Sequence, residues 1–429
     1  MNWIAMKMLV GDKAKFLGIV MGLTFAALLI TQQGSIFCGL MCRTAGQVFD
    51  INGADLWVMD ANVRYVDDVK PMIENNLYRV RGVRGVKWAV PLYKGNARAK
   101  INSYGYSADP IAARRQRETE AAGGRVAWTK HEVIEQVILL GLDDASLVGA
   151  PPSQRILAGD LGDLRRPDAV IVDFTRLRKL YPGEDWSKEP PAKQLYSNEK
   201  IDGSFYNRFL GRDIEMNDHR AIIVGVCVAT RTFQSNAVVY TTYSRAKLFA
   251  PQERKVLSYV LAKADDGVAP AEVAAEIAKQ TGLRARTSHE FVWDTIDYYL
   301  KYTGIPINFG ITAALGFLVG TAIAGQTFYN FTLENLKQFG ALKAMGATNL
   351  RIVGMIMLQA TVVGLLGYGL GVGLAAGFGE AMRGGELAYY TPPHLLPITG
   401  GAVVMICILS SLVSVRRVVV LEPAIVFRG

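Results

Sequence analysis

Uncharged apolar runs occur four times along the chain and dominate its pattern. They cover residues 16–40, 305–331, 352–378 and about 397–415. Because a bilayer core about 30 Å thick needs about 20 helical residues, each run is long enough to cross a membrane as a helix. One such run could be a buried helix of a soluble protein, but four of them predict a membrane protein with four transmembrane helices.

The first run could also be the apolar core of a signal peptide, because Lys7, Lys13 and Lys15 precede it. Signal cores are usually only about 7–15 residues long, and a small-x-small cleavage site normally follows them. No such site follows this run cleanly. We therefore expect a retained membrane helix.

Residues 41–304, between the first two runs, have an ordinary globular pattern. Short apolar runs rich in β-branched residues alternate with helical patterns, which predicts an α+β domain inserted between transmembrane helices 1 and 2. We expect strands at 54–60, 83–91, 136–142, 169–173, 221–228, 237–242 and 256–262. We expect helices at 66–78 and 270–280, and exposed loops at 185–203 and around Arg114, Arg115 and Arg117. A docking patch for anionic lipid headgroups is the alternative for these arginines.

Basic residues flank the apolar runs unevenly and predict the orientation. Three precede the first run, three lie in 332–351, three follow the fourth run, and 379–396 has one. By the positive-inside rule, both termini and the 332–351 segment are cytoplasmic, whereas the 41–304 domain lies outside. The expected order is a cytoplasmic arm with helix 1 (1–40), the outer domain (41–304), helix 2 (305–331), a cytoplasmic segment (332–351), helix 3 (352–378), an outer loop (379–396), helix 4 (397–415) and a cytoplasmic tail (416–429).

Charge and composition exclude several classes of protein. The chain has 47 Lys and Arg residues against 38 Asp and Glu, a formal net charge of +9. Part of this excess flanks the apolar runs, where membrane topology explains it, so it does not predict nucleic-acid binding. Hydrophobic residues make up 50% of the chain, which excludes an intrinsically disordered protein. The four runs contain no Asp, Glu, Lys or Arg, so they resemble a packed bundle more than an ion path.

The third apolar run is rich in glycine. Several of these glycines are four residues apart, which places small residues on one helix face and lets another helix approach closely. Close packing is the interpretation we favour, and a functional hinge is the alternative. The candidate packing residues are Gly367, Gly369, Gly371, Gly373 and Gly377.

Motifs of catalysis and cofactor binding do not occur in the sequence. The four histidines do not have metal-ligand spacing, and neither a GxSxG elbow nor a GxxxxGK[ST] loop is present. We therefore expect no enzyme activity in this chain, and no catalytic, cofactor-binding or metal-binding residue.

The 334–348 segment is short and amphipathic. Leu336, Phe339, Leu342 and Met345 recur every three residues and predict an apolar stripe. Outside the bilayer core such a stripe needs a partner surface or the headgroup layer. Gly340 and Gly346 permit a bend and a close backbone approach. A docking helix is the first interpretation, and an interfacial linker without a partner is the second.

The order of helices and outer domain resembles the MacB/FtsX-type ABC transporter permeases. The segment from Glu334 to Ala347 is similar to the family's E-x-x-x-x-[IF]-G-x-x-[KR]-A-x-G-A coupling helix, and 421–428 is similar to its L-[DE]-P-x-x-[AV]-[LF]-[RK] tail. Residues 233–243 together with this tail resemble the DevC-like branch. The resemblance implies a MacB-like periplasmic core domain and an ATPase-docking coupling segment of Glu334, Leu336, Lys337, Phe339, Gly340, Leu342, Lys343, Met345, Gly346 and Ala347.

The resemblance also implies a function and a set of partners. It implies a permease subunit in a bacterial inner membrane, acting as a homodimer with an ABC ATPase that binds ATP and Mg²⁺. A periplasmic adaptor and a TolC-like outer-membrane channel would complete an export system for a lipid-like or amphiphilic cargo, and membrane lipid surrounds the spans. The alternatives are an FtsX-like signalling permease that regulates a cell-wall hydrolase and a LolC/E-like permease that extracts lipoproteins.

Overall fold

The computed structural model describes residues 2–107, 109–190, 203–251, 256–382, 385 and 387–419. The chain forms two compact units, Met1–Leu40 with Thr303–Gly429, and Met41–Tyr302. We call them the helical unit and the sheet unit. The chain passes between them after Leu40, inside a helix, and again after Tyr302.

Among its described residues, the helical unit contains four helices that are long and apolar enough to cross a membrane, which agrees with the expected number. Each long helix extends past its apolar run at one or both ends, because the backbone hydrogen bonds continue into the polar flanks. Pro306 lies in the first turn of the helix that begins at Ile305. Backbone N–H groups have no partner within a helix at this position, so the missing N–H of proline costs no hydrogen bond. The helices are α1 (Asn2–Gly11), α2 (Lys13–Thr44), α11 (Ile305–Glu334), α12 (Leu336–Ala344), α13 (Asn349–Ala381) and α14 (Leu395–Val419).

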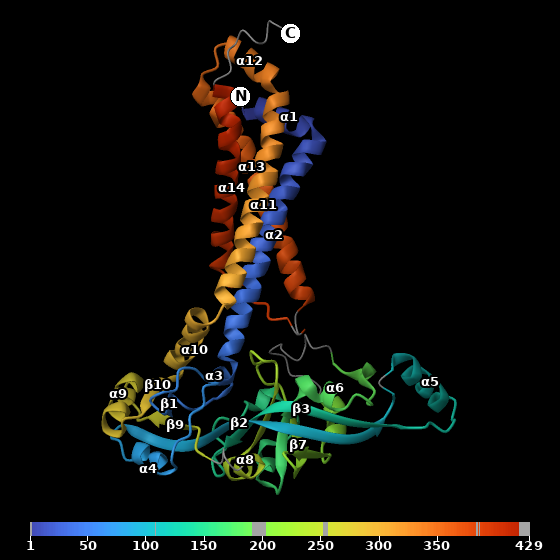
Figure 1. Cartoon of the computed structure of the whole chain (residues 1–429), viewed down its shortest axis with the longest axis vertical. Helices are drawn as coiled ribbons and strands as arrows, with labels where there is room; N and C mark the ends of the chain where they lie inside the picture. Colours follow the sequence, from blue (N-terminus) through green and yellow to red (C-terminus); the bar gives the residue numbers. More distant parts are fainter. Residues whose placement is uncertain are drawn as a thin grey trace. The chain divides into compact units, whose positions relative to one another are not determined.

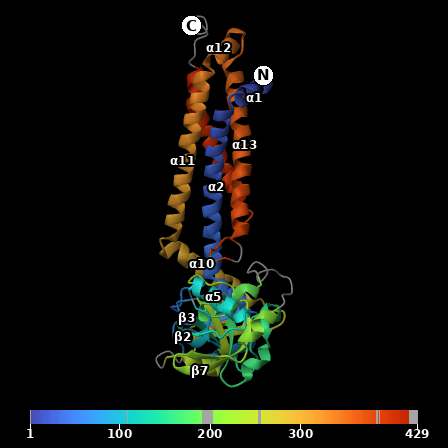
Figure 2. The same ribbon diagram turned by 90° about the vertical axis from the view of Figure 1, so that its right-hand side faces the viewer.

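Small residues hold the bundle together. Figure 2 shows α2 between α11 and α13. On α11, Gly316 faces Leu29 of α2, and a Cβ there would lie 3.1 Å from the leucine Cβ. Thr31 of α2 also donates a hydrogen bond to Thr399 of α14 at 3.3 Å. Close approach of backbones and bonds between hydroxyl groups are the usual means by which helices associate in lipid.

The sheet unit contains one 10-stranded sheet, of order β10-β1-β9-β2-β3-β8-β5-β7-β4, with β6 beside β2 and β7. β3 and β8 are parallel, as are β5 and β7, and the other pairs are antiparallel. The long strand β2 pairs first with β9 and then with β3 (Figure 1). The strands are β1 (Leu56–Met59), β2 (Val86–Gly105), β3 (Thr129–Leu142), β4 (Ile156–Gly159), β5 (Ala169–Asp173), β6 (Asp213–Met216), β7 (His219–Cys227), β8 (Ala237–Thr242), β9 (Tyr259–Ala264) and β10 (Arg284–Thr287).

Hydrophobic cores lie on both faces of this sheet. Because neighbouring side chains of a strand point to opposite faces, Ala89 and Tyr93 of β2 enter one core and Val90 and Leu92 the other. The first core is covered by α4 (Asn75–Arg81), α6 (Leu177–Leu180), α8 (Tyr243–Phe249) and α9 (Pro270–Thr281). The second is covered by α3 (Gly46–Asp50) and α10 (Ser288–Tyr302). The remaining elements are α5 (Pro110–Ala121) and the 3-10 turns Ser153–Arg155, Leu161–Arg165, Phe174–Arg176, Trp186–Lys188 and Ser204–Phe209.

The predicted α+β domain between the first two transmembrane helices is therefore confirmed, but two of its details were wrong. Of the helix expected at 66–78, only residues 75–78 are helical, as the start of α4, because Pro71 disfavours helix before it and a long-range hydrogen bond to Thr295 holds the Val66 N–H. The expected loop around Arg114 is the helix α5, whose first turn is capped by Asp109, which accepts from Ile111 N–H at 3.2 Å. The side chains of Arg114, Arg115 and Arg117 are nevertheless exposed.

Several strands are also longer or shifted relative to the expected ranges. β2 continues through polar residues as far as Gly105, and β3 begins at Thr129, earlier than expected. Both extensions are strands because they pair with each other. Part of the expected 185–203 loop is the 3-10 turn Trp186–Lys188. Residues 191–202 and the family-like tail at 421–428 lie outside the described residues.

Candidate functional site

The predicted coupling segment is a short helix between two membrane-length helices. α11 ends at Glu334, and α12 covers Leu336–Ala344. After α12, the Ala347 N–H donates to the Leu342 carbonyl at 3.0 Å. Gly346 has a φ of +92°, a conformation that residues with a side chain rarely adopt. This glycine therefore ends α12 and turns the chain toward α13.

One face of α12 is covered by the helical unit itself. Phe339 is fully buried, Leu342 is nearly so, and Leu336 packs beside them. The residues around them belong to three other helices: Ala5 of α1, Ile352, Met355 and Ile356 of α13, and Val418 of α14. The expectation that this apolar stripe needs a partner surface or the headgroup layer is therefore wrong for Phe339 and Leu342, because neighbouring helices of the same unit bury them and partly cover Leu336.

Exposed residues also gather where α12 gives way to α13, at 344–350, which we call the α12–α13 turn. Met345 is 75% exposed and Leu350 is 82% exposed. Gly346 between them is exposed and Ala347 is half-buried, while Lys337 is exposed on α12 itself. Burying a side chain of this size contributes about 1.5–3 kcal/mol, so two of them at one turn form a surface suited to a protein partner.

Other residues of the predicted coupling segment are held within the helical unit. Lys15 of α2 forms ion pairs with Glu334 and with Asp12, the latter at 2.6 Å. Lys343 donates to the Val419 carbonyl of α14 at 3.0 Å. Gly340 is buried. These residues position α12, and the docking role of the whole segment stays a prediction.

The five predicted packing glycines of α13 divide into two groups. Gly367 and Gly371 face α2 so closely that a Cβ on Gly371 would lie 2.6 Å from the Ala27 Cβ. Around Gly369, Gly373 and Gly377, a Cβ would meet nothing within 4 Å in the described part of the chain. The close approach of helices therefore depends on Gly367 and Gly371.

In the sheet unit, the first helix after α2 is clamped by a buried carboxylate. Asp50, the last residue of α3, is 3% exposed. Its Oδ2 accepts from Thr230 N–H at 2.6 Å, and its Oδ1 accepts from Arg155 Nη1 at 2.5 Å and from the Thr230 hydroxyl. Burial raises the pKa of Asp50, while the bonds from Thr230 and Arg155 oppose that rise. The carboxylate thus ties α3 to the segment after β7.

A second buried carboxylate lies at the end of β5. Asp173 accepts from Ala229 N–H at 3.2 Å and from the Thr175 hydroxyl. Burial raises the pKa of Asp173 to about 7, and Asp50 adds to the rise through like-charge repulsion. Asp50 and Asp173 thus hold neighbouring residues, Thr230 and Ala229, of the same segment.

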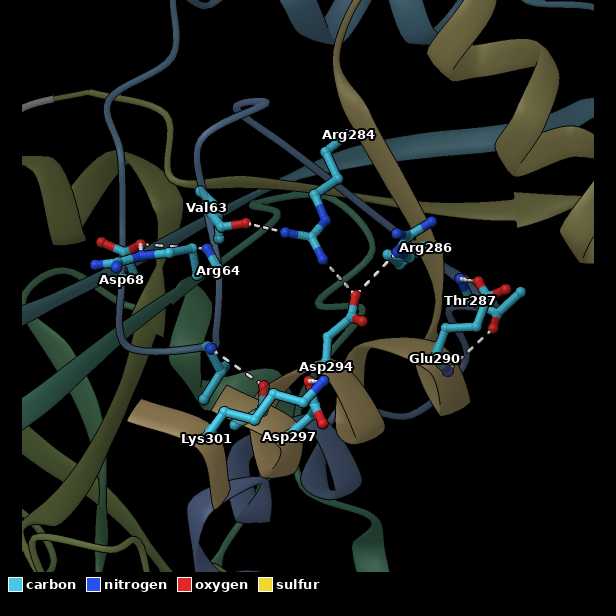
Figure 3. Close-up of polar contacts among 12 residues, drawn as sticks. Val63, Arg64, Asp68, Arg284, Arg286, Thr287, Glu290, Asp294, Asp297 and Lys301 are labelled. Carbon is cyan, nitrogen blue, oxygen red and sulfur yellow. Dashed lines mark hydrogen bonds and ion pairs between the residues drawn. The ribbon is translucent and has the colours of Figure 1, made fainter. Parts of the chain in front are cut away.

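The helix α10, which precedes α11 in the chain, is fixed to the sheet unit by polar contacts (Figure 3). Asp294 of α10 pairs with Arg284 at 2.6 Å and with Arg286 at 2.9 Å, both on β10. Arg284 also donates to the Val63 carbonyl. Thr295 accepts from Val66 N–H at 3.2 Å.

Both connections to the helical unit meet in one core of the sheet unit. Val48 of α3 and Ala45, the residue before this helix, pack in the same cluster as Phe291 and Val292 of α10. The two helices that adjoin the helical unit along the chain therefore share one hydrophobic core.

The C-terminal region also matches a known protein family. Residues 310–423 match the family model described as "FtsX-like permease C-terminal". This part of the chain is an FtsX-like permease domain. The FtsX-like domain contains nearly all of α11, all of α12 and α13, and the described part of α14.

Relatives of the chain are ABC transporter permeases. The chain is 31% identical over 130 residues to an uncharacterized ABC transporter permease of Mycobacterium bovis and to one of Mycobacterium tuberculosis, a match that covers 28% of this chain. The matched stretch spans 33% of the length of these relatives. Another uncharacterized ABC transporter permease of Mycobacterium tuberculosis is 31% identical over 122 residues.

Two solved structures of outer domains are similar to part of the chain. The extracellular domain of the ABC-type transporter YknZ from Gram-positive bacteria aligns with 55% of this chain and 98% of its own, at 12% identity and a TM-score of 0.31. The periplasmic region of MacB from Actinobacillus actinomycetemcomitans aligns with 60% of this chain and 96% of its own, at 12% identity and a TM-score of 0.33. At these TM-scores, the fold of the sheet unit rests on its own strand order and register. The DevC-like branch stays a prediction.

Sequence reasoning found the FtsX-like domain but missed the clamps of the sheet unit. The buried positions of α10 recur at helical spacing, and the apolar ones among them, Phe291, Val292 and Tyr299, could have indicated this helix. Asp50, Arg155 and Thr230 are far apart in the sequence, and only the fold brings them together.

Proposed function

We propose that the chain is the permease subunit of an ABC-type export system, located in a bacterial inner membrane. In this proposal both termini and α12 are cytoplasmic, and the sheet unit is periplasmic. A separate ATPase subunit binds ATP and Mg²⁺ and supplies the energy. The permease carries the resulting motion from the ATPase to the sheet unit.

One observation carries this proposal: the FtsX-like domain exposes Met345 and Leu350 at a turn between two membrane-length helices. The buried face of α12 packs on α1, α13 and α14, so a force on the turn reaches several helices at once. At the opposite ends of the spans, α2 leads to α3 and α10 leads to α11. Because α3 and α10 share one core, movements of α2 and α11 would both act on the sheet unit.

The remaining partners follow the same proposal. A second copy of the chain would complete the permease within membrane lipid, and a periplasmic adaptor with a TolC-like channel would carry a lipid-like or amphiphilic cargo outward. An FtsX-like signalling permease and a LolC/E-like lipoprotein extractor are the alternative functions. All three share the ATPase and differ in what the sheet unit contacts.

Co-purification in mild detergent tests the proposal. The tagged chain should retain an ABC ATPase, and Leu350→Glu should remove it, since a charge would replace the most exposed apolar side chain of the α12–α13 turn. Ile73→Glu is the matched control, because Ile73 is an exposed isoleucine of the sheet unit. Equal retention of the ATPase by both variants would exclude the turn as the docking surface.

The other co-purified proteins separate the alternatives. A periplasmic adaptor supports export. A regulator of a cell-wall hydrolase supports signalling, and a bound lipoprotein supports extraction.

A further inference from the structure

The N-terminal helix α1 is apolar apart from Asn2 and Lys7, but the helical unit covers only one of its faces. Ala5 and Leu9 are fully buried. Gln359 of α13 donates from Nε2 to the Ala5 carbonyl at 2.8 Å, which fixes α1 against α13. Large apolar side chains gathered on an exposed face normally mark a contact with protein or lipid. The opposite face of α1 therefore requires a covering that this chain does not supply within its described residues.

The uncovered face has a defined composition. Trp3 is 69% exposed and Val10 is 48% exposed, and Lys7 lies between them on the same side of the helix. The Lys7 Nζ lies 4.2 Å from the centre of the Trp3 ring. Lys13, the first residue of α2, is also exposed. Tryptophan is enriched at membrane–water interfaces, and lysines next to a membrane surface are attracted to anionic headgroups.

The position of α1 along the bundle fits this interface. Leu17 and Met21 of α2 are exposed apolar residues one turn apart and mark the start of the lipid-facing surface. Leu17 lies seven positions after Val10 in the sequence. If the chain between them were one continuous helix, Val10 would lie about 10 Å beyond Leu17 along the axis of α2, and the crosswise direction of α1 (Figure 1) shortens this distance. The headgroup layer is about 5–8 Å thick on each side of the hydrocarbon core. Figure 1 shows α1 lying crosswise to α2, at the end of the bundle that also carries α12.

We propose that the face formed by Trp3, Lys7 and Val10 binds the anionic headgroup layer of the membrane leaflet at this end of the bundle. Trp3 and Val10 enter the boundary between headgroups and acyl chains, where tryptophan is enriched. Lys7 and Lys13 pair with lipid phosphates, since the chain offers no acidic side chain to either of them among its described ion pairs. This proposal does not depend on the proposed transport function.

The same contact has a consequence for α12. Ala5 packs in one cluster with Phe339 and Leu342, so the inner face of α1 supports the coupling helix. A headgroup layer that holds the outer face of α1 thereby stabilises the position of α12.

Tryptophan quenching tests whether α1 contacts lipid. The full-length chain and its Trp3→Tyr variant are reconstituted into vesicles of phosphatidylcholine and phosphatidylglycerol, and the difference between their emission spectra gives the Trp3 signal. We expect lipids brominated close to the headgroup to quench this signal more than aqueous acrylamide does. A Trp3 signal that acrylamide reaches and brominated lipid does not would mean that α1 faces water or a protein, and it would overturn the proposal.

A charge variant tests the anionic part separately. Lys7→Gln should lower the enrichment of phosphatidylglycerol over phosphatidylcholine around the purified chain, by at most about fivefold, because one lysine near an anionic surface is lost while the other basic residues are unchanged. Lys279→Gln is the matched control, because Lys279 is an exposed lysine of α9 in the sheet unit. Equal enrichment in both variants would overturn the headgroup contact even if Trp3 is quenched by lipid. Both α1 substitutions change exposed side chains, so unchanged thermal unfolding is expected and is measured alongside.

Discussion

Replacing Asp50 with alanine tests how firmly α3 is clamped to the sheet unit. The carboxylate accepts from Thr230 N–H at 2.6 Å, from the Thr230 hydroxyl, and from Arg155 at 2.5 Å. A hydrogen bond to a charged group contributes about 1.5–3 kcal/mol. Arg155 is half-exposed, so its ion pair contributes only about 0–1 kcal/mol. We expect Asp50→Ala to lower the free energy of unfolding of the sheet unit by about 2–4 kcal/mol.

The assay is urea unfolding of the full-length chain in detergent, followed by intrinsic fluorescence. Arg155→Gln is the matched control and should cost about 0–1 kcal/mol, because it removes only the half-exposed partner. If the free energy of unfolding of both variants lies within about 1 kcal/mol of that of the wild type, the buried hydrogen bonds between Asp50 and Thr230 do not hold α3 in place. In the proposed complex with an ATPase, Asp50→Ala should keep ATP hydrolysis and lose the coupling of hydrolysis to the sheet unit.

Three further predictions concern other parts of the chain. Gly371→Ala should destabilise the bundle by about 1–3 kcal/mol in detergent unfolding, because the added methyl group meets α2, while Gly373→Ala, where a Cβ meets nothing within 4 Å, should not destabilise it. The pKa of Asp173 rises from 3.8 to about 7 on folding, so its contribution is full below about pH 4 and is lost as the pH rises through 7. Between pH 8 and pH 5 the wild type should therefore gain stability relative to Asp173→Asn, and parallel pH profiles would contradict this. A cysteine at Asn349 should react with an impermeant thiol reagent only from the cytoplasm, and labelling from outside would reverse the topology.

The membrane helices could be predicted because lipid imposes a simple requirement on the sequence. About 20 apolar residues without charge are needed for each span, and the runs show this directly. The ends of the helices could not be predicted from the apolar runs. For example, α2 continues past the end of its run at residue 40 to Thr44.

The candidate docking surface was only partly predictable. The three-residue spacing of Phe339, Leu342 and Met345 correctly indicated an apolar face, but spacing does not say what covers it. Phe339 and Leu342 are buried because α1, α13 and α14 return to the same end of the bundle. Met345 stays exposed, together with Leu350, which the pattern did not include.

The clamps of the sheet unit depend on contacts between distant parts of the chain. Asp50 and Thr230 look like ordinary polar residues in the sequence, and their bond forms only once β7 and α3 are in place. The part of β2 beyond residue 91 and the polar first half of β3 were missed for the same reason. Each of these polar segments is a strand only because it pairs with the other.

The most direct test of the transmission proposal is a distance between the sheet units of two assembled copies. Spin labels on Ile73→Cys, an exposed position of the sheet unit, report this distance by pulsed electron paramagnetic resonance in the complex with its ATPase. We predict that trapping ATP changes the distance and that Leu350→Glu abolishes the change. An unchanged distance in a complex that binds and hydrolyses ATP would contradict the proposal that this chain carries motion from the ATPase to the sheet unit.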